Sequence, residues 1–148
     1  MRWDGSDLRR LTSDPAEDGE PVWSPDGRRI LFASRRAGEA EVFLVNADGT
    51  GLTRLTTTPR GYSRRAEWSP DGRRIAFGSN REGNDDIYIM NADGSDVVNI
   101  SRHPAREYFS RWSPDGRRIL FTSNRDRRQN AICAMDADGA NVIRLVPR

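Results

Sequence analysis

The octapeptide Trp-Ser-Pro-Asp-Gly-Arg-Arg-Ile occurs three times in this chain of 148 residues. Its copies begin at residues 23, 68 and 112, which gives spacings of 45 and then 44 residues. An Asp-Gly pair recurs at nearly the same spacing, at Asp48, Asp93 and Asp138, and once more at Asp4. Repetition at a fixed period of roughly 40–45 residues is typical of arrays of four-stranded sheets. The chain therefore contains three copies of one structural unit.

Each unit is predicted to contain four short strands. The Pro-Asp-Gly part of the octapeptide favours a tight turn, because Pro fixes φ at the second turn position and Asp-Gly supports the reversal that follows. The later Asp-Gly pair predicts a hairpin turn between the third and fourth strands. The expected strands span residues 21–23, 29–34, 41–46 and 52–56 in unit one, 66–69, 74–79, 86–91 and 97–101 in unit two, and 110–113, 118–123, 131–136 and 142–146 in unit three. No segment has a helical period of useful length, so the chain is predicted to be all-β.

The middle strands of the units are apolar at consecutive positions rather than at alternate ones, as in Ile30-Leu31-Phe32-Ala33. Such a strand must be covered on both faces. Short antiparallel sheets achieve this by stacking on a neighbour at either side, which is the arrangement of a β-propeller. We therefore predict a half propeller of three four-stranded antiparallel blades, over about residues 20–57, 65–101 and 109–146. An extra N-terminal outer strand is expected at residues 8–12, within about residues 6–12.

Composition excludes several classes of partner. The 24 basic residues, all of them Arg, are interspersed with 22 acidic ones, whereas nucleic-acid binding needs a clustered basic stripe. The single cysteine, Cys133, excludes an intrachain disulfide and a Cys-rich zinc site. No apolar stretch approaches the roughly 20 residues that span a membrane, so no membrane insertion is expected. The first residues lack the apolar region of a signal peptide, which predicts a cytoplasmic location if the chain is complete.

The segment that carries the second octapeptide, residues 68–94, reads Trp-Ser-Pro-Asp-Gly-Arg-Arg-Ile-Ala-Phe-Gly-Ser-Asn-Arg-Glu-Gly-Asn-Asp-Asp-Ile-Tyr-Ile-Met-Asn-Ala-Asp-Gly. It resembles the WD40-like blade repeat of TolB-type β-propellers, and the resemblance covers nearly the whole chain. Unit one departs at residues 37–40, and unit three at residues 126–131 and at Cys133, where unit two has Tyr88. The resemblance implies a scaffold that binds proteins or ligands at a funnel mouth, in the periplasm if the chain is a fragment of a TolB-like protein. The family that it resembles also includes gating domains fused to serine peptidases.

No motif indicates catalysis or a cofactor. A Gly-x-Ser-x-Gly elbow and a Gly-rich phosphate loop are missing, and His103 is the only imidazole, which argues against a catalytic triad or a multi-His metal site. The Asp-Gly loops lack the further oxygen ligands and the bidentate Glu of a calcium loop. The repeated carboxylates Asp26, Asp71 and Asp115 are interpreted as turn formers. The tryptophans Trp23, Trp68 and Trp112 are expected in the core between blades.

Loops that enter the first strand of a blade, or join its second and third strands, lie on one face of a propeller. On this face the sequence varies from unit to unit, whereas the Asp-Gly turns of the opposite face repeat. We predict a binding face for a protein or peptide here, because Arg and Tyr are typical of protein contact surfaces. The alternative is that these are solvated loop residues. The candidate residues are Arg60, Tyr62, Arg64, Arg65, His103, Arg106, Glu107 and Tyr108.

Three blades are fewer than the roughly four to eight of closed propellers. We expect the outer faces of blades 1 and 3 to expose apolar residues such as Phe32, Val42, Leu44, Phe121 and Ile132, which is rare for a monomer. A homodimer with six blades would cover them, and a nine-bladed homotrimer is the alternative. Residues 8–12 could pair with the edge of the partner's third blade, although the partner's own residues 142–146 are expected at the same edge. The other functions left open are a propeller that gates a serine peptidase or other hydrolase, and an assembly module with no ligand.

Overall fold

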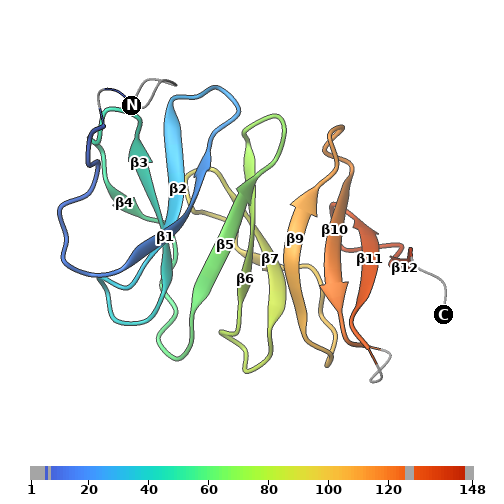
Figure 1. Cartoon of the computed structure of the whole chain (residues 1–148). Coiled ribbons are helices and arrows are strands. Elements are labelled where there is room, and N and C mark those ends of the chain that lie inside the picture. The colour runs from blue at the N-terminus through green and yellow to red at the C-terminus, as the bar shows by residue number, and fades with distance from the viewer. Residues whose placement is uncertain (1–5, 7, 126–128, 146–148) are drawn as a thin grey trace.

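The computed structural model describes residues 6, 8–125 and 129–145, and these form three four-stranded antiparallel sheets with no helix among them. Figure 1 shows the sheets following one another across the molecule, from blade 1 in blue to blade 3 in orange and red. The prediction of three four-stranded blades is therefore confirmed. The strands are β1 (Asp18–Trp23), β2 (Arg29–Ser34), β3 (Glu41–Asn46) and β4 (Thr53–Arg54) in blade 1, β5 (Ser63–Trp68), β6 (Arg74–Ser79), β7 (Asp86–Asn91) and β8 (Val98–Asn99) in blade 2, and β9 (Glu107–Trp112), β10 (Arg118–Ser123), β11 (Ala131–Asp136) and β12 (Ile143–Arg144) in blade 3.

Consecutive blades pack face to face, which explains the uninterrupted apolar runs of their middle strands. Leu31 and Val42 of blade 1 share a cluster of buried residues with Trp68, Phe77 and Met90 of blade 2. The other face of blade 2 packs on blade 3 in the same way, through a cluster of Ala76, Ile87, Ile89, Ile100, Trp112, Ile119, Phe121, Ala131, Cys133 and Met135. Blade 2 is thus apolar on both faces because both are covered.

The end faces differ from the expectation. Val42 and Phe121 are fully buried, because their side chains point toward blade 2 rather than away from it. Leu44 is partly buried against the same blade 1–blade 2 cluster. Phe32 does lie on the outer face of blade 1, but it is 4% exposed there, packed with Leu11 of the N-terminal segment. Only Ile132, on the outer face of blade 3, is exposed as expected.

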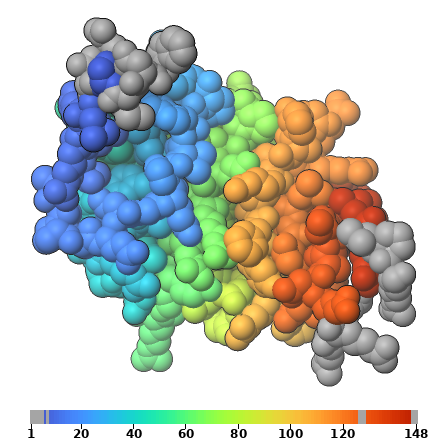
Figure 2. Space-filling model, in the orientation of Figure 1, coloured from blue at the N-terminus to red at the C-terminus, as the bar shows by residue number. Residues whose placement is uncertain are grey.

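The extra N-terminal strand is absent: residues 8–12 have no strand conformation. In each blade the outer strand forms its ladder with the third strand, for example β4 with β3, and residues 8–12 have no such strand beside them. The segment instead runs along the side of blade 1 that faces away from blade 2 (Figures 1 and 2). Asp4 and Gly5, the first of the Asp-Gly pairs, lie outside the described residues.

The innermost strand of every blade contains a bulge at the same position. Pairing of β1 with β2 shifts register between Gly19 and Val22, and the equivalent shifts occur in β5 and β9. One non-glycine residue of each bulge has a positive φ, which is uncommon: Glu20 at 55°, Arg65 at 55° and Phe109 at 58°. A bulge redirects side chains locally, and these three residues become neighbours in the site described next.

Candidate binding surface

Five of the eight predicted site residues line one small cavity between blades 2 and 3. Its volume is about 20 Å³, enough for about one water molecule. The predicted residues in its wall are Tyr62, Arg64, Arg65, Glu107 and Tyr108, and they are joined by Gly78, Ser79, Asp85 and Phe109. The sequence predicted these five residues on one face, and the packing of two blades brings together residues that are 44 positions apart.

Asp85 organises the polar side of this cavity. The hydroxyl of Tyr62 donates a hydrogen bond to Asp85, and Arg106 Nε lies 3.7 Å from the same carboxylate. Burial, followed by the hydrogen bond to Asp85, raises the pKa of Tyr62. The guanidinium of Arg64 lies over the Tyr62 ring, 4.4 Å from its centroid. Asp85 was not among the predicted residues of the binding face, and it fixes the orientation of two that were.

Glu107 does not belong to the exposed face. It is fully buried, and its Oε1 accepts hydrogen bonds from Arg125 at 2.5 Å and from Ser123 at 2.9 Å. The prediction treated it as a loop residue, whereas it is the first residue of β9 and its side chain is buried. Its role is structural, because it holds Arg125 beside the ring of Phe121.

Two further candidates lie away from the cavity. Arg60 is exposed at the start of the loop that leads into β5. His103 is half-buried, and its Nδ1 accepts a hydrogen bond from the backbone N–H of Ala105 at 3.0 Å. The side-chain amide of Asn84 also donates to the carbonyls of His103 and Ala105. His103 therefore shapes its own loop.

The three bulge residues form a second, larger feature, which we call the central groove. Its volume is about 300 Å³, and it is lined by Glu20, Pro21, Val22, Arg65, Ala66, Phe109 and Arg111. Arg65 links the blades across it: its backbone N–H donates to Glu20 Oε2 at 2.7 Å, and its guanidinium lies 4.0 Å from the Phe109 ring centroid. Phe109 and Arg111 were not predicted as site residues. The signal for Phe109 is that its repeat position carries Glu, Arg and Phe in the three blades.

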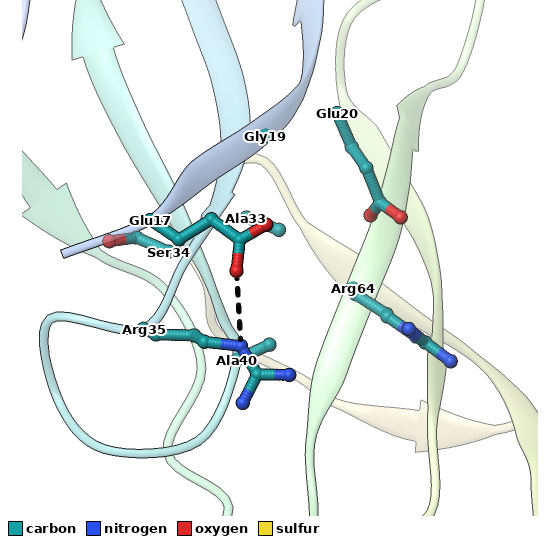
Figure 3. A pocket seen from close by; sticks show the side chains of 8 residues that line it. All are labelled: Glu17, Gly19, Glu20, Ala33, Ser34, Arg35, Ala40 and Arg64. Atoms are coloured by element: carbon teal, nitrogen blue, oxygen red, sulfur yellow. Dashed lines mark ion pairs between the residues drawn. The ribbon is translucent and has the colours of Figure 1, made fainter.

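A third hollow of about 130 Å³ lies between blades 1 and 2. Figure 3 shows Glu17 paired with Arg35 on one side of it, with Glu20 and Arg64 on the other. The Glu17–Arg35 separation is 3.7 Å, and both side chains are more than half exposed. Glu20 also lines the central groove, and Arg64 also lines the small cavity. The three hollows are therefore neighbours along the innermost strands.

No group of three or more His, Cys, Asp and Glu side chains in the part of the chain that the structure describes is arranged to hold a metal ion. None of the described residues forms a helix long and apolar enough to cross a membrane. What the surface offers is a mixture of guanidinium, carboxylate and aromatic groups, which suits recognition of another molecule by contact.

The model of the TolB β-propeller domain family matches residues 60–147, which is more than half of the chain. The chain belongs to this family. A Tol-Pal system protein TolB from Syntrophus aciditrophicus is 41% identical over 54 residues, which are 36% of this chain and 12% of that protein. The TolB of Bordetella pertussis is 44% identical over 45 residues, 30% of this chain and 10% of that protein. The chain thus spans a small part of the curated relatives that it matches.

Solved TolB structures have the same blades. The putative TolB of Agrobacterium tumefaciens is 30% identical with a TM-score of 0.78, and the match covers 90% of this chain and 50% of that one. TolB from Acinetobacter baumannii is 24% identical with a TM-score of 0.81, covering 93% of this chain and 34% of that one. A puromycin hydrolase matches at 19% identity with a TM-score of 0.76, over 94% of this chain and 23% of that one. At that identity the likeness shows the fold alone.

Proposed function

We propose that this propeller array is a non-enzymatic scaffold that binds a protein or peptide on its variable-loop face. The observation that supports this most is the gathering of Arg64, Arg65, Tyr108 and Phe109 where the small cavity and the central groove meet. Arg and aromatic side chains are the residues that protein interfaces enrich and that contribute most to binding energy. Membership of the TolB family supports the same role and a periplasmic location.

The arrangement favours an extended or looped segment as the ligand. The central groove is open along three innermost strands, and Arg65 and Arg111 each already hold one carboxylate, Glu20 and Glu67. A ligand that carries carboxylate and apolar side chains can exchange with these pairs and stack on Phe109, which is 53% exposed. A protein loop or peptide meets this requirement.

A pull-down compares the wild-type chain with a variant in which Arg60, Tyr62, Arg64 and Tyr108 are changed to Ala. We expect the variant to lose the proteins that the wild type recovers. The matched control changes Arg28, Arg73 and Arg117 to Ala; these are the exposed arginines of the repeated turns on the opposite face. Its recovery should equal that of the wild type, and circular dichroism checks that both variants stay folded. Equal recovery by the loop-face variant would dismiss this surface.

We also propose that the chain assembles with itself, because apolar residues on the outer face of blade 3, such as Ile132, are exposed. A six-bladed homodimer fits the match that covers half of the Agrobacterium protein, and a nine-bladed homotrimer is the alternative closure. As a scaffold, such a ring would present the variable-loop face of each copy around one axis.

A second function is favoured by the propeller of the puromycin hydrolases, which has the same fold. In that case the chain is part of a domain that gates a hydrolase. The discriminating observation is the full-length gene: a downstream α/β-hydrolase segment with a nucleophile elbow favours the gate, and its absence favours the scaffold.

A further inference from the structure

The two interfaces between blades inside the chain repeat one cation–π contact. The second Arg of one octapeptide lies over the Trp of the next: Arg29 Cζ is 4.7 Å from the Trp68 ring centroid, and Arg74 Cζ is 4.9 Å from that of Trp112. These tryptophans are 4% and 8% exposed. The contact is therefore part of how one blade recognises the next, since the same octapeptide supplies both halves.

The ends of the array present the two unused halves of this contact. Trp23 is the Trp of the first octapeptide, and it is 58% exposed. Arg118 is the second Arg of the last octapeptide; its side chain is 59% exposed and lies 3.7 Å from Asp136. Each end thus carries a residue whose equivalents are in contact at both internal interfaces.

The apolar residues of the blade 3 end face follow the same rule. Leu120, Ile132 and Leu145 are 39%, 49% and 46% exposed. Their equivalents in blade 1 are Leu31, Val42 and Leu55, and these are at most 9% exposed because blade 2 covers them. The exposed face of blade 3 therefore carries the same kind of residues that blade 2 covers on blade 1.

We propose that a second copy of this chain covers that face, with its Trp23 under Arg118 of the first copy. The inference rests on the self-assembly proposed above and assigns its contact. A second copy is the occupant because one sequence contains both complementary ends, and because one chain covers half of the Agrobacterium propeller protein. The contact joins two different surfaces, so it closes into a ring only when the last copy meets the first.

Docking has to displace the N-terminal segment. A Cβ built on Gly49 would lie 3.4 Å from the carbonyl oxygen of Leu11. At the interface between blades 1 and 2, a Cβ built on the equivalent Gly94 would lie next to Leu55. Leu11 therefore occupies the place that Leu145 of the arriving copy needs. Leu11 packs against blade 1, and Arg9 donates a hydrogen bond to the Asp48 carbonyl. Residues 8–12 pair with no strand, so a blade with its own outer strand can replace them.

Cysteine cross-linking tests the contact. Trp23→Cys and Arg118→Cys are prepared as separate variants, mixed in equal amounts and treated with a bismaleimide, which bridges thiols that are too far apart for a disulfide; Cys133 is buried, so it stays unreactive. We expect a covalent dimer from the mixture and little from either variant alone. Trp23→Cys mixed with Val98→Cys is the control, because Val98 lies on the outer strand of the middle blade. Cross-linking of Trp23→Cys alone, equal to that of the mixture, would mean that two blade 1 faces meet and would overturn the proposal.

A second measurement does not depend on cross-linking. Ile132→Glu should reduce the mass in solution to that of one chain at a concentration where the wild type is assembled, whereas Val98→Glu, at a similarly exposed position, should leave the assembly unchanged. An unchanged mass for Ile132→Glu would overturn the contact. Cross-linking in the mixture together with a three-chain mass would support the contact and overturn the six-bladed ring. If Ile132→Glu prevents assembly but still recovers the same proteins in the pull-down, the binding face is independent of assembly. The proposed binding face and the proposed contact between copies can therefore be tested separately.

Discussion

The side chains of the Trp-Ser-Pro-Asp-Gly motif stabilise the turn that they form. Ser24 Oγ donates to Asp26 at 2.5 Å and accepts a hydrogen bond from the backbone N–H of Arg29 at 2.9 Å. The bond from Ser24 lowers the pKa of Asp26, and the equivalent serines do the same at Asp71 and Asp115. These carboxylates are occupied within their own turns, which supports the interpretation of the repeated Asp as a turn former.

One repeat position that varies between blades faces the groove. Glu20, Arg65 and Phe109 occupy one repeat position, yet they differ in charge and shape, and Arg65 contacts the other two. Arg65 could be predicted from its loop composition. Phe109 was missed because the sequence of β9 does not reveal the bulge that redirects its side chain; the variation at its repeat position is the one signal that marks it.

Glu107 gives a prediction at this scale. Glu107→Ala leaves the guanidinium of Arg125, only 23% exposed, without its carboxylate. Breaking a buried ion pair on one side costs about 3 kcal/mol, so urea denaturation should show a loss of that order in the free energy of unfolding. Glu39→Ala, which removes an exposed i,i+4 partner of Arg35, should cost no more than about 0.5 kcal/mol. Similar losses in both variants would contradict the structural role of Glu107.

Strands could be predicted wherever a turn motif and an apolar run agreed. The second and third strands of each blade begin and end at the expected residues, for example β6 at Arg74–Ser79. Residues 8–12 have the sequence of an outer strand, with Leu11 in the place of Leu55, but form none. An outer strand depends on the third strand of its own blade, which is a long-range condition that local sequence does not contain.

Glycines of the Asp-Gly hairpins give a prediction at the scale of elements. Gly139 has φ of +90°, and a Cβ on it would lie 2.2 Å from the Ile100 carbonyl oxygen of the preceding blade. Gly139→Ala therefore combines backbone strain with a clash between blades, and we expect a loss of about 3 kcal/mol in thermal or urea unfolding. Gly38→Ala isolates the strain, because φ is +105° and nothing lies within 4 Å; its cost should be about 1 kcal/mol. Equal costs would show that the hairpin does not contact the preceding blade tightly.

At the scale of the whole molecule, the two ends of the array are not alike. The sequence predicted two exposed apolar faces, but it could not assign which side of each strand faces which blade, so Val42 and Phe121 were expected on the wrong side. In the structure Leu11 packs on the outer face of blade 1, while Leu120, Ile132 and Leu145 of blade 3 stay exposed. Under the proposed self-assembly, these unequal ends would join copies end to end.

The mass in solution, measured by light scattering coupled to gel filtration at micromolar concentration, tests the half-ring account most directly. Since the residues that are buried between blades inside the chain are exposed at its end, the account predicts a species of twice the 16.7 kDa of one chain. A mass of three chains would replace the six-bladed ring with a nine-bladed one. A species of 16.7 kDa would contradict the account.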